Sequence, residues 1–434
     1  GATLNSSGGS ISIVNATTGT TASDADGTDG SGVWTMLLKT PTNGDILVLW
    51  INGATADGAM VLEYGASCTG TPDCTGLKLY QNNVIVRSEH TGNTISNADL
   101  SGCDADSGTG CNDAEIGYTS NSNNLTVSSG YRFFVWTGDT FDPGGTVTTN
   151  ATGGDFHVDD NAVAYLDTAS NVIGLDALVD GGGTLYIDTT TRIEGGDITT
   201  SGTSAVVTYT GGQTPTLTIA DVGVCDLTDD YIGGGTTPTL SFYNLTTGYG
   251  GCGTTNISKT VSVNQTLSVP LQAKLTMAAD VSVGVSLTMG DSATVTYSGT
   301  PTLTMTGTGN LGSVATSDSL TVYNLTISGT VTTVADTVNV ANNVSLTGTL
   351  NANTDMIVLG GSIYTVSGGG GTMTYTSGTP TVTLRNTGTL GPISGATGSI
   401  NMKFYNLTLS YNGTALVTTL RQNVIVDNNL NQTK

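Results

Sequence analysis

The sequence predicts an all-β protein, and three observations lead to that prediction. Short runs alternate apolar and polar residues with a period of two, and threonine and valine dominate them. Glycine is abundant, with 61 residues, and Gly, Asn and Asp turn signals separate the runs. A long internal repeat occupies the second half of the chain. Because no stretch has a convincing amphipathic helical pattern, we expect an N-terminal β-sandwich followed by a repetitive β-solenoid.

The repeat is marked by the pentapeptide Phe/Val-Tyr-Asn-Leu-Thr. Its tyrosines stand at positions 243, 323 and 405, so they are 80 and 82 residues apart. A Thr-Tyr-Thr/Ser block and a Pro-Thr-Leu/Val-Thr block precede each copy, and a Val-X-Val run follows it. Because these pieces keep their order each time, the period of about 80 residues indicates a repeat architecture.

The apolar positions change phase inside each pentapeptide. Leu240 and Phe242 alternate in one phase, whereas Tyr243 and Leu245 alternate in the other. A one-residue slip moves every side chain to the other face, so a strand with one buried side cannot hold both sets. We therefore predict a β-bulge or a corner at each Phe/Val–Tyr junction. A strand that is buried on both faces is the alternative.

Three regions follow one another along the chain. Residues 1–150 contain all three tryptophans and four of the six cysteines, and their turn spacing predicts the N-terminal β-sandwich domain. Residues 151–205 are a transitional β region, and residues 206–434 are the β repeat region. Each repeat fits either three or four β-helical coils of roughly 20–25 residues or one sandwich. Phase slips suit the corners of a solenoid, so we favour the β-helical coils. Tandem β-sandwich domains are the alternative.

The last repeat stops partway through a period at Lys434. We expect either a longer gene product or a neighbouring subunit to complete it.

Charge and hydropathy exclude several classes of partner. The net charge is −23, and only 11 residues are lysine or arginine, so there is no basic patch for nucleic acid or an anionic membrane surface. The longest apolar run covers residues 46–51, which is too short to span a bilayer. The chain begins at Gly1, as expected for an exported protein whose leader was removed. We therefore expect an extracellular, cell-surface location.

The six cysteines fall into three neighbouring pairs. An even number of cysteines in an exported chain indicates disulfides. A zinc site is disfavoured because the chain has no Cys-X-X-Cys motif and only two histidines. The predicted bridges are Cys68–Cys74, Cys103–Cys111 and Cys225–Cys252.

Asn-X-Ser/Thr sequons are dense, so N-linked glycans are one group that the sequence predicts, although a chain rich in Asn, Ser and Thr also forms sequons by chance. In the three pentapeptides, the asparagine lies on the strand face opposite tyrosine and leucine, where a glycan would reach solvent. The predicted glycosylation sites are Asn124, Asn150, Asn244, Asn256, Asn264, Asn324, Asn343, Asn406 and Asn412, and further sequons begin at Asn5, Asn15 and Asn431.

Calcium is the other group that the sequence indicates. Asp24, Asp26 and Asp29 lie in a glycine-rich loop, and hard cations bind several oxygens in a tight turn. The downstream glutamate of an EF-hand is missing, and Asp-Gly pairs are equally ordinary turn residues. Asp104 and Asp106 are weaker candidates of the same kind.

No catalytic constellation is evident, so we do not expect an enzyme. A Ser-His-Asp group would need His90 or His157, and the chain has no nucleophile-elbow motif. A carbohydrate-active solenoid enzyme would need clustered carboxylates, yet no glutamate follows Glu194.

The Tyr-Asn-Leu-Thr repeat, with its Thr-Tyr-Thr/Ser and Pro-Thr-Leu/Val-Thr blocks, resembles Gly/Thr/Ser-rich repeat proteins of prokaryotic cell surfaces, many of them adhesin-like. The resemblance covers roughly residues 150–434 and implies a surface location. We expect an extracellular structural protein that self-assembles into a surface filament, sheath or surface layer. The alternative is an adhesin with an N-terminal binding head and a repeat stalk.

Overall fold

The structure is a computed structural model, and it confirms the predicted all-β class. Strands hold 55% of the residues and helices 2%. The chain divides into two compact units, unit 1 (1–217 and 234–239) and unit 2 (218–233 and 240–434). The described residues are 10–433 except 25–33, 35–37, 39–40, 54–56, 66–67, 69–73, 75, 91, 93, 107–109, 122, 151–153, 169, 220–229, 249–253, 313–317, 336, 366–369, 393–399 and 411–417.

Unit 1 contains a β-solenoid with three faces, each a stack of short parallel strands. Each turn of the chain adds one strand to each face. Face 1 holds β5 (Asn83–Ser88), β9 (Arg132–Val135), β12 (Phe156–Val158), β15 (Ala177–Val179) and β18 (Ile198–Thr200); face 2 holds β6 (Thr94–Ile95), β10 (Thr140–Phe141), β13 (Val163–Leu166), β16 (Thr184–Ile187) and β19 (Val206–Thr208); face 3 holds β8 (Asn124–Val127), β11 (Thr146–Thr149), β14 (Asn171–Ile173) and β17 (Thr191–Ile193).

An antiparallel sheet precedes the turns of unit 1. It consists of β2 (Thr20–Asp24), β1 (Ser10–Asn15), β3 (Ile46–Asn52) and β4 (Ala59–Glu63), in that order. β4 pairs in parallel with β5, so this sheet continues into face 1. The remaining elements here are helix α1 (Asn97–Leu100), a 3-10 helix (Ala114–Ile116) and β7 (Tyr118–Asn121), which pairs antiparallel with β8.

This arrangement differs from the sandwich expected for residues 1–150. The antiparallel strands continue through β5 into face 1, and β6 and β8 to β11 already belong to solenoid turns. A period-two pattern with regular turn signals is the same for antiparallel and parallel pairing. The sequence pattern therefore could not separate the two arrangements.

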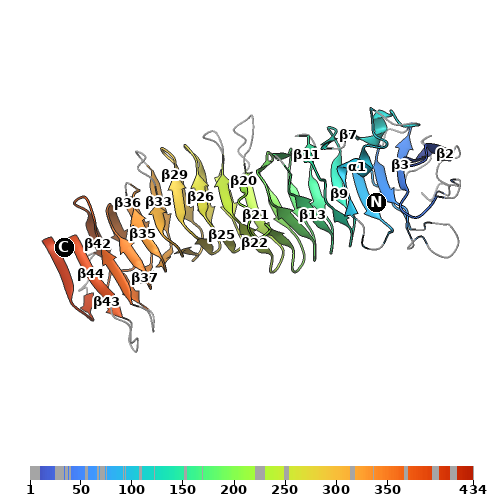
Figure 1. Cartoon of the computed structure of the whole chain (residues 1–434). Coiled ribbons are helices and arrows are strands. Elements are labelled where there is room, and N and C mark those ends of the chain that lie inside the picture. The colour runs from blue at the N-terminus through green and yellow to red at the C-terminus, as the bar shows by residue number, and fades with distance from the viewer. Residues whose placement is uncertain are drawn as a thin grey trace. The chain divides into compact units, whose positions relative to one another are not determined.

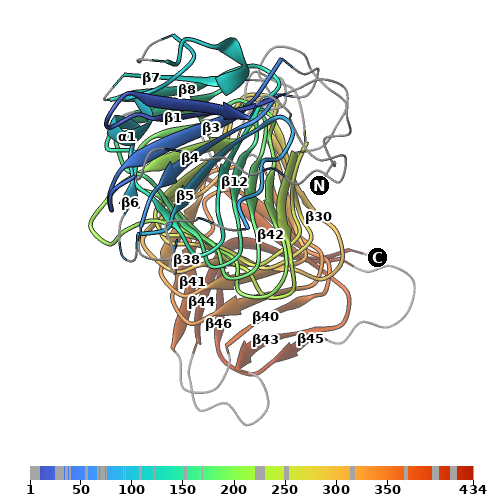
Figure 2. The ribbon, with the colours of Figure 1, turned by 90° about the vertical axis from the view of Figure 1, so that its right-hand side faces the viewer.

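Unit 2 is a β-solenoid of the same kind, which confirms the predicted repeat fold. Figure 1 shows its short strands side by side, and Figure 2 separates the faces at its C-terminal end. Face 1 holds β24 (Thr254–Ile257), β27 (Lys274–Met277), β30 (Thr294–Tyr297), β33 (Ser319–Val322), β36 (Thr337–Val340), β39 (Asp355–Val358) and β42 (Thr381–Arg385); face 2 holds β22 (Thr239–Phe242), β25 (Val261–Val263), β28 (Val281–Val283), β31 (Thr302–Met305), β34 (Asn324–Ile327), β37 (Asn343–Leu346), β40 (Ser362–Thr365), β43 (Gly388–Pro392) and β45 (Thr418–Leu420); face 3 holds β23 (Asn244–Thr247), β26 (Thr266–Val269), β29 (Ser286–Met289), β32 (Gly309–Leu311), β35 (Thr330–Thr333), β38 (Thr349–Asn351) and β41 (Gly371–Thr374).

Two long strands and two strands shared by the units remain, and β22 is also shared because its first residue, Thr239, belongs to unit 1. β44 (Ile400–Ser410) and β46 (Val424–Thr433) each run along face 3 and then face 1 of unit 2. β20 (Thr216–Ile219) and β21 (Asp230–Gly234) contain residues of both units.

Inward-facing side chains of unit 2 stack in columns. On face 2, Val281, Leu303 and Leu325 are in register on consecutive turns, and each is at most 1% exposed. Burying one such side chain contributes about 1.5–3 kcal/mol relative to leaving it in water. The alternation of apolar and polar residues therefore builds a continuous core, with one residue of each column in every turn.

A column of glycines forms one corner of unit 2. Gly284, Gly307, Gly329 and Gly348 follow the face 2 strands of four consecutive turns. A Cβ on Gly307 would lie 1.9 Å from the carbonyl oxygen of Gly284, and one on Gly329 would lie 1.8 Å from that of Gly307. The turns approach so closely here that only glycine fits.

The predicted phase slips occur at corners. β22 ends at Phe242 and β23 begins at Asn244, so Tyr243 lies at the bend. Tyr323 takes the same place between β33 and β34. In the third copy, the β44–β46 register shifts between Phe404 and Asn406. Both apolar phases are buried, because the chain changes face between them.

The three copies of the pentapeptide occupy three different corners of unit 2. The first joins faces 2 and 3, the second joins faces 1 and 2, and the third joins faces 3 and 1. Between copies the strand labels advance from 22 to 33 and from 33 to 44, which is 11 strands each time. Three strands make a turn, so each repeat falls one strand short of four turns. Successive repeats are therefore related by a screw operation.

Candidate functional site

The second and third repeats each build a cluster of stacked residues at a corner, which we call the corner module. In the second copy, the rings of Tyr297 and Tyr323 lie 5.5 Å apart. The backbone N–H of Asn324 donates to the carbonyl of Pro301 at 3.2 Å, and Asn342 Nδ2 donates to Asn324 Oδ1 at 2.9 Å. The separate sequence blocks thus meet on consecutive turns.

The third copy repeats this geometry. The rings of Tyr375 and Tyr405 are 5.6 Å apart, and the Asn406 N–H donates to the carbonyl of Pro380 at 3.1 Å. Asn428 Nδ2 donates to Asn406 Oδ1 at 2.9 Å. A ladder of half-buried and exposed asparagines pairs amide groups across consecutive turns, and the tyrosine rings pack beside it, which accounts for the recurrence of these residue types at the bend.

The predicted glycosylation sites occupy different environments. Asn244, Asn324 and Asn406 are half-buried at their corners. Their glycosylation stays a prediction. Among the others, Asn124, Asn150 and Asn264 are exposed, Asn256 and Asn343 are half-buried, and Asn412 lies outside the described residues.

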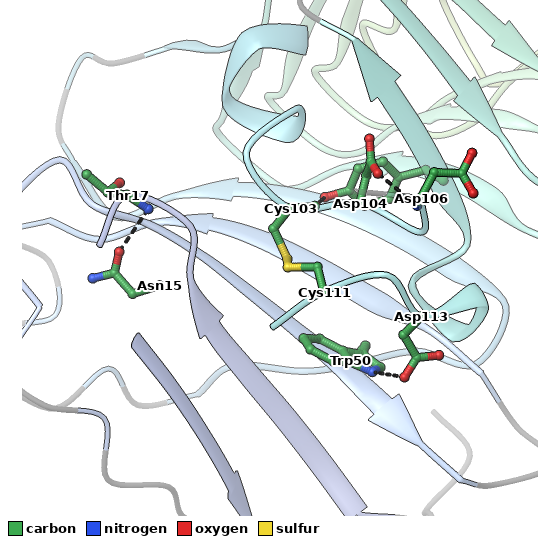
Figure 3. The surroundings of a disulfide bond; sticks show 9 residues. Asn15, Thr17, Trp50, Cys103, Asp104, Asp106, Cys111 and Asp113 are labelled. Atoms are coloured by element: carbon green, nitrogen blue, oxygen red, sulfur yellow. Dashed lines mark hydrogen bonds between the residues drawn. A yellow bond between two sulfur atoms is a disulfide. The ribbon is translucent and has the colours of Figure 1, made fainter. Parts of the chain in front are cut away.

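Asn15 shows that one sequon has a structural role. Its side chain is 1% exposed, and its Nδ2 donates to Asp45 Oδ2 at 2.7 Å. Its Oδ1 accepts the Thr17 N–H at 3.0 Å, as Figure 3 shows. These bonds hold the β1–β2 turn and leave no access for a glycan.

Two of the three predicted disulfides form. Cys68 bonds Cys74, and Cys103 bonds Cys111. Figure 3 shows the second bridge beside Trp50, whose Nε1 donates to Asp113 Oδ2 at 3.0 Å. Cys225 and Cys252 lie outside the described residues.

The structure describes little of the predicted calcium loop. Asp24 is the last residue of β2, whereas Asp26 and Asp29 lie outside the described residues. The weaker candidate Asp104 is 2% exposed, and its oxygens accept the N–H groups of Asp106 at 2.9 Å and Ser120 at 2.7 Å. Asp104 thus stabilises local backbone.

His90 belongs to a polar network beside face 1 of unit 1. Its Nδ1 lies 3.2 Å from Glu63 Oε1, and its Nε2 lies 3.1 Å from Asn43 Nδ2. Ser88 Oγ donates to Glu63 Oε2 at 2.8 Å. The carboxylate thus lies between the hydroxyl and the imidazole, whereas a nucleophilic serine needs direct contact with the imidazole.

Burial raises the pKa values of Asp139, Asp142 and Asp176 in unit 1, most strongly those of Asp139 and Asp176. Burial raises the pKa of Asp139 to about 7, although Arg87 and the Ser88 N–H favour its ionised form. Burial, together with the neighbouring carboxylates Asp197 and Asp155, raises the pKa of Asp176 to about 6.

A shallow pocket lies on unit 2 at the corner between faces 3 and 1. Asn353, Asp355 and Pro380 are among its lining residues. Asp355 is the one carboxylate in that lining, which contains neither histidine nor cysteine. The described pocket thus lacks the paired groups of acid–base catalysis.

The last described turn of unit 2 exposes apolar residues. Leu420 continues the face 2 column above Leu390, yet Leu420 is 58% exposed and Leu390 is 0%. Leu430 continues the column of Leu407 and is 64% exposed, against 2% for Leu407. Sequence reasoning identified an incomplete period here but not these side chains. They form a surface with the geometry of a core cut open, which we call the open turn.

Comparisons with known proteins give no family for this chain. No protein-family model matches it, and no curated protein or solved structure shows significant similarity. In the described part of the chain, the helices are all too short or too polar to cross a bilayer.

Proposed function

We propose that this chain is an extracellular structural protein that associates with itself into a surface filament, sheath or surface layer. The stacked, repeating turns carry the proposal, and the open turn offers a strand edge at which to test it. β46 pairs with β44 along one edge, and Leu420 and Leu430 occupy core positions while remaining exposed. An apolar strand edge of this kind accepts another strand, either from further residues of the same gene product or from a second copy, because strand addition supplies backbone hydrogen bonds and covers the apolar side chains.

Two further features support an extracellular structural role. The two disulfides of unit 1 are typical of oxidising compartments. The stacked turns form a repeat protein, whose length grows with the number of copies. Structural proteins use such folds as rods.

The test compares two leucines that are both more than half exposed. Leu430→Asp places a charge in the open turn, whereas Leu271→Asp changes a 52% exposed residue in the turn between β26 and β27. We expect the wild-type chain to form oligomers or fibres as its concentration rises, Leu271→Asp to behave likewise, and Leu430→Asp to stay monomeric. Sedimentation velocity and negative-stain microscopy give the readout. A wild-type chain that is monomeric at every concentration, or a Leu430→Asp variant that still assembles, would overturn the proposal.

A further inference from the structure

A second group of polar side chains, apart from the open turn, gathers at one corner of unit 1. His157 lies on β12, Asp159 directly follows that strand, and Asp180 directly follows β15. β12 and β15 pair in parallel with Val158 opposite Val179, so Asp159 and Asp180 occupy equivalent positions on consecutive turns. The parallel register thus brings together residues that are 21 and 23 positions apart in the sequence.

The three side chains converge on one point. One possible ligand atom from each lies within 4.8 Å of the others. His157 Nε2 is 2.8 Å from Asp180 Oδ2. The imidazole packs edge-on against the ring of Phe134 at 4.5 Å, and its side chain is 12% exposed. This packing fixes the direction in which Nε2 points.

Both carboxylates are held by hydroxyl groups from other turns. Ser201 Oγ donates to Asp180 Oδ1 at 2.5 Å, and the Thr137 hydroxyl donates to Asp159 Oδ2. His157 Nδ1 is buried without a hydrogen-bond partner among the described residues, and the imidazole contacts Asp180 through Nε2. Packing thus orients the imidazole, and hydroxyl groups orient the two carboxylates, as outer contacts do in metal sites.

We propose that His157, Asp159 and Asp180 bind a divalent transition-metal ion, with Zn²⁺ as the best match. One imidazole nitrogen and two carboxylate oxygens suit zinc, which takes three protein ligands and a water. Calcium instead takes six to eight oxygens and magnesium an octahedron of oxygens, neither of which this set provides. The ion takes the place of the direct contact between His157 Nε2 and Asp180 Oδ2. It links two turns directly and, through Thr137 and Ser201, their neighbours.

The first experiment titrates ZnCl₂ into the chelator-treated full chain by calorimetry. Co²⁺ then serves as a spectroscopic probe, because its visible absorption reports tetrahedral nitrogen–oxygen ligation. We expect one tight site, and a loss of affinity of about 10–100-fold or more in His157→Gln and Asp180→Asn, since each removes a ligand. His90→Gln is the matched control, because His90 also contacts a carboxylate, Glu63, but lies outside the cluster. We expect His90→Gln to bind Zn²⁺ as tightly as the wild-type chain.

Circular dichroism establishes that each variant is folded, and Asp159→Asn provides an independent ligand change if another variant fails to fold. The proposal is overturned if the wild-type chain binds no Zn²⁺, or if His157→Gln binds it as tightly as the wild type. The proposal is also overturned if the wild-type chain binds Ca²⁺ as tightly as Zn²⁺ and His157→Gln keeps that Ca²⁺ affinity, because the imidazole would then not be a ligand.

Discussion

Single glycines set how closely the turns of unit 2 stack. At Gly329, an added Cβ would lie 1.8 Å from the Gly307 carbonyl oxygen, a backbone atom that cannot rotate away. We expect Gly329→Ala to separate the turns locally and to lower the free energy of unfolding by about 1–3 kcal/mol, as overpacking does.

Differential scanning calorimetry of that variant measures the effect. Gly211→Ala is the control, because nothing lies within 4 Å of its added Cβ. Equal melting temperatures for the two variants would contradict the role assigned to the glycine column.

Half-buried aspartates make unit 1 sensitive to pH. The folded-state pKa of Asp176 is about 6, above the usual value near 3.8, because of burial and the carboxylates of Asp197 and Asp155. Between about pH 4 and pH 6 the folded chain therefore holds a proton that the unfolded chain releases, so this contribution to stability is complete at low pH and is lost as the pH rises through 6. Asp139 acts in the same direction up to about pH 7.

We expect Asp176→Asn to raise the melting temperature at pH 8 and to change it little at pH 4. The neutral amide removes the cost of a buried charge only where the aspartate would be ionised. Thermal denaturation at both pH values measures this difference, and an equal shift at both would show that the charge is not the cause.

The residue types of the core were predictable, whereas several polar roles were not. Alternating Val, Leu and Thr identified strands and their buried faces, because a period of two is a local property. Asn15 begins a sequon, but its side chain forms a structural hydrogen bond with Asp45, which is 30 positions away in the sequence. His157 and Asp180 meet only through parallel pairing, whose register no local pattern specifies.

At the scale of elements, the corner module is the unit that repeats. Tyr323 packs on Tyr297, and Asn324 accepts from Asn342 on the next turn. The phase slip made a bend at this point predictable from sequence. The stacking of the Pro-Thr block against the pentapeptide was not predictable from sequence, because it depends on the number of residues per turn.

We expect Asn324→Ala to destabilise unit 2 by about 1–3 kcal/mol, because it leaves the half-buried Asn342 amide without its acceptor. Asn264→Ala is a matched control, since Asn264 is an exposed sequon asparagine at a neighbouring corner. Chemical denaturation followed by circular dichroism compares the two. A smaller loss of unfolding free energy for Asn324→Ala than for Asn264→Ala would contradict a stabilising role for the asparagine ladder.

At the scale of the whole molecule, charge opposes the proposed assembly. Each chain has a net charge of −23, so copies repel one another at long range. Added salt shortens that repulsion to a Debye length of about 8 Å at 0.15 M, while the apolar contact of the open turn remains. We therefore expect self-association to increase with salt and as the pH approaches the pI of about 4.1.

Light scattering across salt concentration and pH tests this expectation, with Leu430→Asp as the control for specific contact. Scattering that falls as salt is added would indicate that ion pairs, not the open turn, hold the copies together.

Each repeat of unit 2 has 11 strands whereas a turn has three, so the number of repeats sets both the length of the solenoid and the rotation of its faces. Duplicating or deleting one whole repeat would change its length by about 18 Å, at roughly 4.8 Å per turn. The same event would rotate the turns beyond it by a third of a revolution about the solenoid axis. Gain or loss of a repeat would therefore change both the length of the solenoid and the direction in which a given face points. Three such events would return the faces to their original direction.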